Sequence, residues 1–174
     1  PFRFSPKDIA VLLVTHAHID HIGRIPKLAR EGFSGVIYST PPTRDLARRL
    51  LEDALSLAER EGEPQLYDER DLEQAFGQWK TVSYDESFAV GDAAVSFLNA
   101  GHILGSALID IRIEGKRLLF TGDLGNEPSA LLPSSESPKG IEYLVIESTY
   151  GNRMHEPAEE RALALPAKLT VPLI

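Results

Sequence analysis

The segment Thr15-His16-Ala17-His18-Ile19-Asp20-His21 places three imidazoles and a carboxylate within six positions, directly after the aliphatic run 9–14. Side chains two residues apart share one face of an extended chain, so His16, His18 and Asp20 can converge. His21 can turn back toward them if a helix begins there. Neutral imidazole suits zinc, and a carboxylate among imidazoles suits a second zinc or a similar divalent ion. Because three of the five histidines of the chain lie here, the segment predicts a metal site.

The amino-acid composition limits the classes of protein to which this chain can belong. A chain of 174 residues that is 43% hydrophobic can form one domain with a substantial core. It has no cysteine, so the metal ligands must be histidines and carboxylates, and we expect a reducing, cytoplasmic location. No stretch approaches the roughly 20 apolar residues of a membrane span, and no secretory signal is visible. We therefore expect no membrane partner, and because the first residue is proline we expect a piece of a longer protein.

The net charge of −8 disfavours general electrostatic capture of polyanions. Attraction to a nucleic acid must then come from metal ions, from a local basic strip or from protein outside this segment.

Hydrophobic periodicity predicts an α/β fold in which helices and strands are mixed as far as residue 79 and strands alone follow. The predicted helices cover residues 24–31, 44–61, with Thr43 as the cap, and 69–79. The predicted strands cover residues 9–15, 35–39, 81–84, 87–90, 94–99, 107–113, 116–121 and 141–147. A loop rich in Pro, Ser and Glu is expected over 126–140.

Three later segments carry further candidate site residues. His102 lies between glycines at the end of a predicted strand, and Gly residues let the backbone approach a site closely. Asp123 lies in a Gly-flanked turn after the next strand, where it could bridge two metals. Either residue alone would be ordinary loop or turn chemistry, but the first segment needs further ligands. Glu147 ends a buried strand and should face the metal cavity or a cation, whereas His155 is expected in a loop.

The pattern HxHxDH at 16–21 resembles the signature of the metallo-β-lactamase superfamily. Within it, Ala-Gly-His-x-x-Gly-Ser at 100–106, Thr-Gly-Asp-Leu-Gly-Asn at 121–126 and Glu-Ser-Thr-Tyr-Gly at 147–151 resemble the β-CASP branch of RNA and DNA nucleases. The resemblance covers about residues 6–156 and implies the N-terminal half of a four-layer αββα sandwich. We accordingly expect a partial metallo-β-lactamase domain over 1–156 and a poorly ordered or out-of-context tail over 157–174.

The resemblance also implies a ligand set and a chemistry. It assigns one zinc to His16, His18 and His102, and a second zinc to Asp20 and His21, with Asp123 bridging the two. Asp20 would also orient the nucleophile, and Glu147 would manage protons at the leaving group. The family's first Asp motif, its inserted domain and its later His motifs are missing from this chain.

The predicted function is zinc-dependent phosphodiester hydrolysis, in an RNA-processing nuclease similar to those that act at mRNA 3′ ends. RNA is the expected partner, with DNA as the alternative, and the complete protein could form a homodimer. A thioesterase or lactonase of the glyoxalase type shares HxHxDH, but has no evident need for the segment 147–151. Two further alternatives are not enzymes. A non-catalytic scaffold would normally have lost some of its metal ligands, and a metal-free binding module would hold no metal ion.

Overall fold

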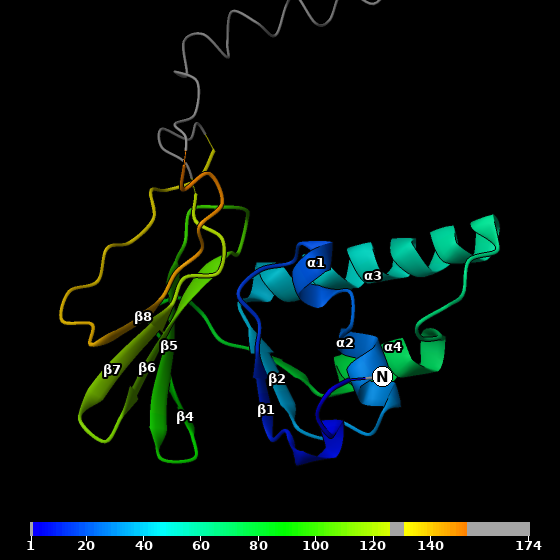
Figure 1. Cartoon of the computed structure of the whole chain (residues 1–174), viewed down its shortest axis with the longest axis horizontal. Coiled ribbons are helices and arrows are strands. Elements are labelled where there is room, and N and C mark those ends of the chain that lie inside the picture. The colour runs from blue at the N-terminus through cyan, green and yellow to red at the C-terminus, as the bar shows by residue number, and fades with distance from the viewer. Residues whose placement is uncertain (1, 126–130, 153–174) are drawn as a thin grey trace, which may run out of the picture.

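A layer of helices, a first β-sheet and a second β-sheet follow one another across the molecule (Figure 1). The computed structural model describes residues 2–125 and 131–152. These residues confirm the predicted mixed α/β fold, and their layers are three of the four in the predicted sandwich. The short helices are η1 (Pro6–Asp8), α1 (Ile19–Ile22) and α2 (Ile25–Arg30), and the longer ones are α3 (Pro41–Glu61) and α4 (Glu69–Gly77). His155 and the predicted tail lie outside the described residues.

The first sheet is parallel and lies between the helices and the second sheet. Its strands are β1 (Val11–Leu13), β2 (Val36–Ser39) and β3 (Trp79–Thr81), hydrogen-bonded in that order. Leu12 is paired with Ile37, and both pack into the helical core. The next pair, Leu13 and Tyr38, packs against the second sheet. The alternation of strand side chains thus gives this sheet two apolar faces, as a sheet covered on both sides requires.

The second sheet contains five strands in sequence order. They are β4 (Ser87–Val90), β5 (Ala93–Asn99), β6 (Ala107–Ile113), β7 (Lys116–Phe120) and β8 (Tyr143–Val145). The pairs from β4 to β7 are antiparallel, whereas β8 pairs with β7 in parallel. Val95, Phe97 and Ile109 face the first sheet, and Leu98 and Leu108 belong to a second cluster on the other face.

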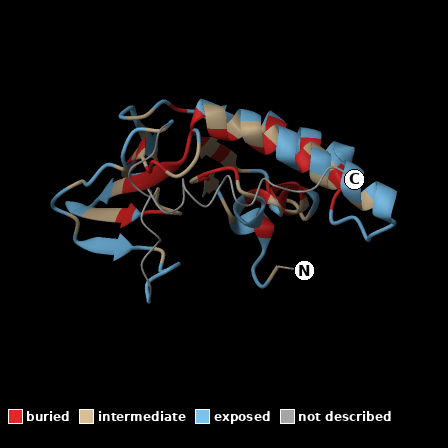
Figure 2. Ribbon diagram, turned by 90° about the horizontal axis from the view of Figure 1, so that it is seen from above, coloured by how far each residue is buried: buried red, intermediate tan, exposed pale blue. Residues whose placement is uncertain are grey.

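Helix α3 begins earlier than predicted. Its cap is Thr40, whose hydroxyl accepts the N–H of Thr43, and Pro41 occupies the first helical position, where its missing N–H costs nothing. The expected cap, Thr43, is buried inside the helix instead. One side of α3 packs on the core and the other is exposed (Figure 2), and Gly62 ends it in the left-handed conformation.

The segment predicted as a helix to Trp79 ends at Gly77, and Trp79 begins β3. The indole is buried, stacks on Phe76 and donates a 2.9 Å hydrogen bond to the Ser39 hydroxyl on β2. This contact with the neighbouring strand outweighs local helix propensity. The predicted strand over 81–84 is correspondingly wrong, because only residue 81 belongs to β3 and Tyr84 makes a single bridge to Phe97.

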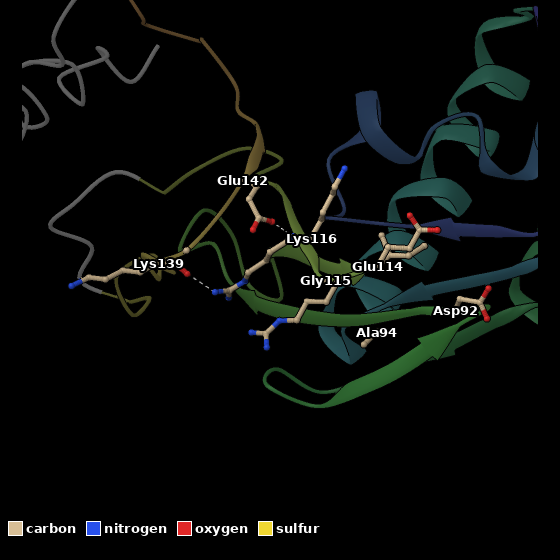
Figure 3. A pocket seen from close by; sticks show the side chains of 11 residues that line it. Asp92, Ala94, Glu114, Gly115, Lys116, Lys139 and Glu142 are labelled. Carbon is tan, nitrogen blue, oxygen red and sulfur yellow. Dashed lines mark hydrogen bonds between the residues drawn. The ribbon is translucent and has the colours of Figure 1, made fainter.

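A buried ion pair ties the loop before β8 to the sheet. The guanidinium of Arg117 donates two 2.9 Å hydrogen bonds to the carboxylate of Asp110, which is buried on β6. Arg117 also donates to the carbonyl of Lys139 and, through its backbone N–H, to the carboxylate of Glu142. Figure 3 shows Lys139 and Glu142 beside this end of the sheet. The pair therefore connects three segments at the end of the sheet where β6 turns into β7.

We expect Arg117→Met to lower the free energy of unfolding by about 3 kcal/mol, because it leaves the Asp110 carboxylate buried without its partner. Urea denaturation measures the change. Arg112→Met is the matched control, since Arg112 is mostly exposed and lies 3.5 Å from the same carboxylate, so its loss should cost under about 1 kcal/mol. The double variant Asp110→Leu/Arg117→Met should recover stability. Equal losses for the Arg117 and Arg112 variants would contradict the assignment.

A search of the described residues finds no helix with both the length and the apolar character needed to cross a membrane.

Candidate metal centre

The predicted metal ligands lie on three segments that follow strand ends, and the predicted catalytic residue Glu147 lies on a fourth, after β8. The first segment leaves β1 and enters α1 at Ile19, the second joins β5 to β6, and the third follows β7. Backbone hydrogen bonds hold the three together: Ala107 N donates to Thr15 O at 2.8 Å, and Gly125 N donates to Ala100 O at 2.9 Å. A Cβ on Gly125 would lie 2.0 Å from the carbonyl oxygen of Gly101, so two of the segments touch backbone to backbone.

Four of the predicted side chains form one tight group. His16, His18, His102 and Asp123 each offer one ligand atom, and these four atoms all lie within 4.8 Å of one another. His18 Nδ1 lies 3.2 Å from His16 Nε2 and 3.1 Å from His102 Nε2. Asp123 Oδ2 lies 3.6 Å from His16 Nε2 and 3.7 Å from His102 Nε2. The group contains one residue from each of two later loops and two from the opening segment.

The two other predicted ligands, Asp20 and His21, lie beside this group, and the rings of His21 and His16 are 4.0 Å apart between centroids. His21 Nε2 is 3.3 Å from Asp123 Oδ1 and 3.6 Å from Asp20 Oδ2. Asp123 therefore directs one oxygen to the group of three histidines and the other to His21. The Asp20 side chain is 75% exposed, so this second group opens to solvent, whereas His16 is fully buried.

The spacing of the first group fits a small tetrahedral cation. Ligands at about 2.0–2.1 Å from zinc in a tetrahedron are separated by about 3.4 Å from one another. The four contacts measured in this group run from 3.1 to 3.7 Å. Three imidazole nitrogens with a carboxylate oxygen are also donors that zinc accepts. The group therefore has the donor atoms and the approximate spacing of a metal site.

Burial keeps two histidines of this group, His16 and His102, ready to bind a cation. Burial, and then the nearby His21, lower the pKa of His16 to about 4, although Asp123 acts in the opposite direction. Burial also lowers the pKa of His102, and His18 adds to the effect, while Asp123 and Glu147 oppose it. Neutral imidazole is the form that binds metal, so these rings need release no proton near pH 7.

The lowered pKa of His16 predicts acid sensitivity of the metal-free protein. The unfolded chain binds a proton at His16 near pH 6.5, but the folded chain does so only near pH 4, so stability is complete above pH 6.5 and falls as the pH decreases. We expect a loss of about 2 kcal/mol between pH 7.5 and pH 5.0. Urea denaturation in chelator measures it, and His16→Asn is the control whose pH dependence should be smaller. Equal pH dependence in both proteins would refute the prediction.

Glu147 lies beside the group but not within it. Its carboxylate accepts the N–H of Leu124 at 2.6 Å, and its own N–H donates to the Thr121 hydroxyl at 3.3 Å. Both contacts hold the turn that carries Asp123. The strand before it, β8, is exposed and not buried as the sequence predicts. Glu147 itself is partly buried, and its negative charge acts to raise the pKa of His102.

The sequence interpretation missed the side chains that hold the site residues in place. The hydroxyl oxygen of Thr15 lies 3.1 Å from His16 Nδ1. The hydroxyl of Ser106 accepts the backbone N–H groups of His102 and Ile103 at 3.0 and 3.1 Å. Each is a small hydroxyl residue within four positions of a predicted ligand. Their closeness in sequence to the predicted ligands is the signal that could have identified these residues.

The chain is similar in sequence to known proteins. A family model described as the metallo-beta-lactamase superfamily matches residues 2–152. Ribonuclease TTHA0252 of Thermus thermophilus is 41% identical over 160 residues, which are 92% of this chain and 36% of that protein. Endoribonuclease YSH1 of Gibberella zeae is 35% identical over 173 residues, which are 96% of this chain and 21% of that protein. Transcription termination factor FttA of Methanocaldococcus jannaschii is 40% identical over 154 residues, 86% of this chain and 24% of that protein.

The family model confirms the predicted resemblance to the superfamily. The names of the relatives confirm the predicted resemblance to nucleases. The chain spans between 21% and 36% of the length of the three relatives named.

Proposed function

Because the chain belongs to the metallo-beta-lactamase superfamily, we propose that it carries the metal centre of a metal-dependent phosphodiesterase that cleaves RNA. The observation that carries the proposal is the position of Asp123, whose two oxygens lie between a group of three histidines and the pair formed by Asp20 and His21. This is the arrangement needed to hold two cations side by side. Relatives named ribonuclease and endoribonuclease support RNA as the substrate.

In this proposal His16, His18 and His102 would hold one zinc ion and Asp20 and His21 would hold a second, with Asp123 as a ligand shared by both. When bound, the ions activate a water molecule near neutral pH and neutralise charge on the phosphate under attack. Asp20 is exposed at the rim of the site, where its second oxygen can accept a hydrogen bond from the attacking water. Glu147, held against the Asp123 turn, is in position to pass a proton toward the leaving oxygen.

A substrate comparison tests the proposal. The full-length protein is freed of metal, reloaded with zinc, and incubated with labelled RNA, with DNA of the same sequence and with a thioester. We expect zinc-dependent cleavage of RNA, and we expect Asp20→Ala and His21→Ala to abolish it. Hydrolysis of the thioester alone would replace the proposal with an esterase, and failure to retain zinc would favour a metal-free binding module.

Several finer predictions remain part of the proposal. They are the identity of the metal as zinc, RNA in preference to DNA, a homodimer of the complete protein, a cytoplasmic location and a domain covering residues 1–156. Metal analysis, the substrate comparison above and light scattering of the full-length protein address the first, second and third of these.

A further inference from the structure

The loop that carries His102 is hydrogen-bonded to the start of α3. The carbonyl oxygen of Gly105 accepts a hydrogen bond from the hydroxyl of Thr40 at 2.6 Å and another from the hydroxyl of Thr43 at 2.8 Å. All three residues are buried. A carbonyl oxygen has two lone pairs, so both hydroxyls can donate to it at once. The contact joins positions 62 and 65 residues apart in the chain.

The backbone conformation of Gly105 and its close contact with α3 both require glycine at this position. Its φ is +83°, and a Cβ there would lie 2.7 Å from the N atom of Thr43 and 2.9 Å from the hydroxyl of Thr40. Glycine is the residue that tolerates both the positive φ and the approach of the helix. The loop therefore rests directly on the first turn of α3.

The contact reaches His102 through one further residue. Ser106, next to Gly105, is fully buried, and its hydroxyl accepts the backbone N–H of His102 at 3.0 Å. The imidazole of His102 in turn lies 3.1 Å from His18 Nδ1. The position of the His102 ring is thus set by a short chain of contacts that begins at the two threonines.

The two threonines differ in what else they do. Thr40 also caps α3 by accepting the N–H of Thr43, so its replacement would weaken the helix as well. The hydroxyl of Thr43 instead donates to the loop carbonyl and lies 3.0 Å from the Thr40 hydroxyl. Thr43 is therefore the residue at which one of the two hydrogen bonds to the loop can be removed with the cap left in place.

We propose that Thr43, acting with Thr40 through Gly105 and Ser106, is a positioning residue for the metal ligand His102. The inference rests on the proposed metal site, because it concerns how one of its ligands is held. Groups that orient metal ligands typically contribute 10- to 100-fold to metal affinity. The threonines act on the backbone of the loop, so the low end of this range is expected.

The test replaces Thr43 by valine, which keeps the shape and removes the hydroxyl, in the full-length protein loaded with Co²⁺. We expect the dissociation constant for Co²⁺ to rise about tenfold and the visible absorption of the bound ion to change, whereas Thr43→Ser restores both. Tyr67→Phe is the matched control. It also removes a buried hydroxyl that donates to a backbone carbonyl, that of Leu51, but it does not touch the loop.

A double-mutant cycle separates positioning from general destabilisation. In a protein that already carries His102→Ala, Thr43→Val should not weaken Co²⁺ binding further. An equal effect in both backgrounds, or an unchanged Co²⁺ spectrum in the single variant, would overturn the inference. Failure of the wild-type protein to bind Co²⁺ would instead overturn the proposed metal site, so the two failures are distinguishable.

Discussion

Replacing Asp123 by alanine is expected to lower RNA cleavage by about 10³-fold or more, equivalent to about 4 kcal/mol of activation free energy, and to reduce the bound metal. The reason is the position of the side chain, which directs Oδ2 toward His16 and His102 and Oδ1 toward His21. Its loss removes one ligand from each group together with the negative charge between two cations.

The measurement pairs metal analysis after gel filtration with single-turnover cleavage of labelled RNA. Asp123→Asn retains one carbonyl oxygen, so we expect it to keep more metal than Asp123→Ala while losing most of the activity. Asp92→Ala is the matched control, because Asp92 is an exposed carboxylate in the turn between β4 and β5. If Asp123→Ala retained the metal content and activity of the wild type, the bridging role would be wrong.

The candidate ligands of the opening segment could be identified from sequence because their pattern is local. Ligand types and spacing lie within six positions, and the strand before them is an unbroken aliphatic run. The later candidates His102 and Asp123 each follow an alternating strand. These strands, β5 and β7, run in the same direction on either side of β6 and so end at the same edge of the sheet. The structure adds distances, and it divides the predicted ligands into a partly buried group that contains His16 and a pair, Asp20 and His21, that is more open to solvent.

What the sequence did not reveal depends on contacts between distant segments. Trp79 fits a helical pattern, but its indole is buried against Phe76 and Ser39, and this favours a strand. Thr40 and Thr43 are both acceptable helix caps, but both hydroxyls also donate to the carbonyl oxygen of Gly105, more than 60 residues away. Local propensity cannot report that these residues meet a loop from another sheet.

Replacing Glu147 by glutamine is expected to lower the rate of RNA cleavage by about 10²–10⁴-fold while leaving metal content unchanged. The amide oxygen of glutamine can still accept the N–H of Leu124, so the turn that carries Asp123 should stay in place. What the substitution removes is the negative charge and the ability to pass a proton. The turnover number should therefore fall with little change in the Michaelis constant.

Comparison with Glu147→Ala separates the two roles that the structure allows for this residue. Alanine removes the acceptor for Leu124 as well as the charge, so it should also lower metal affinity by loosening the Asp123 turn. If glutamine preserved activity and alanine alone abolished it, Glu147 would only support the turn. If both variants lost activity while only alanine lost metal, the carboxylate would be acting on the reaction itself, as its position beside His102 and the Asp123 turn predicts.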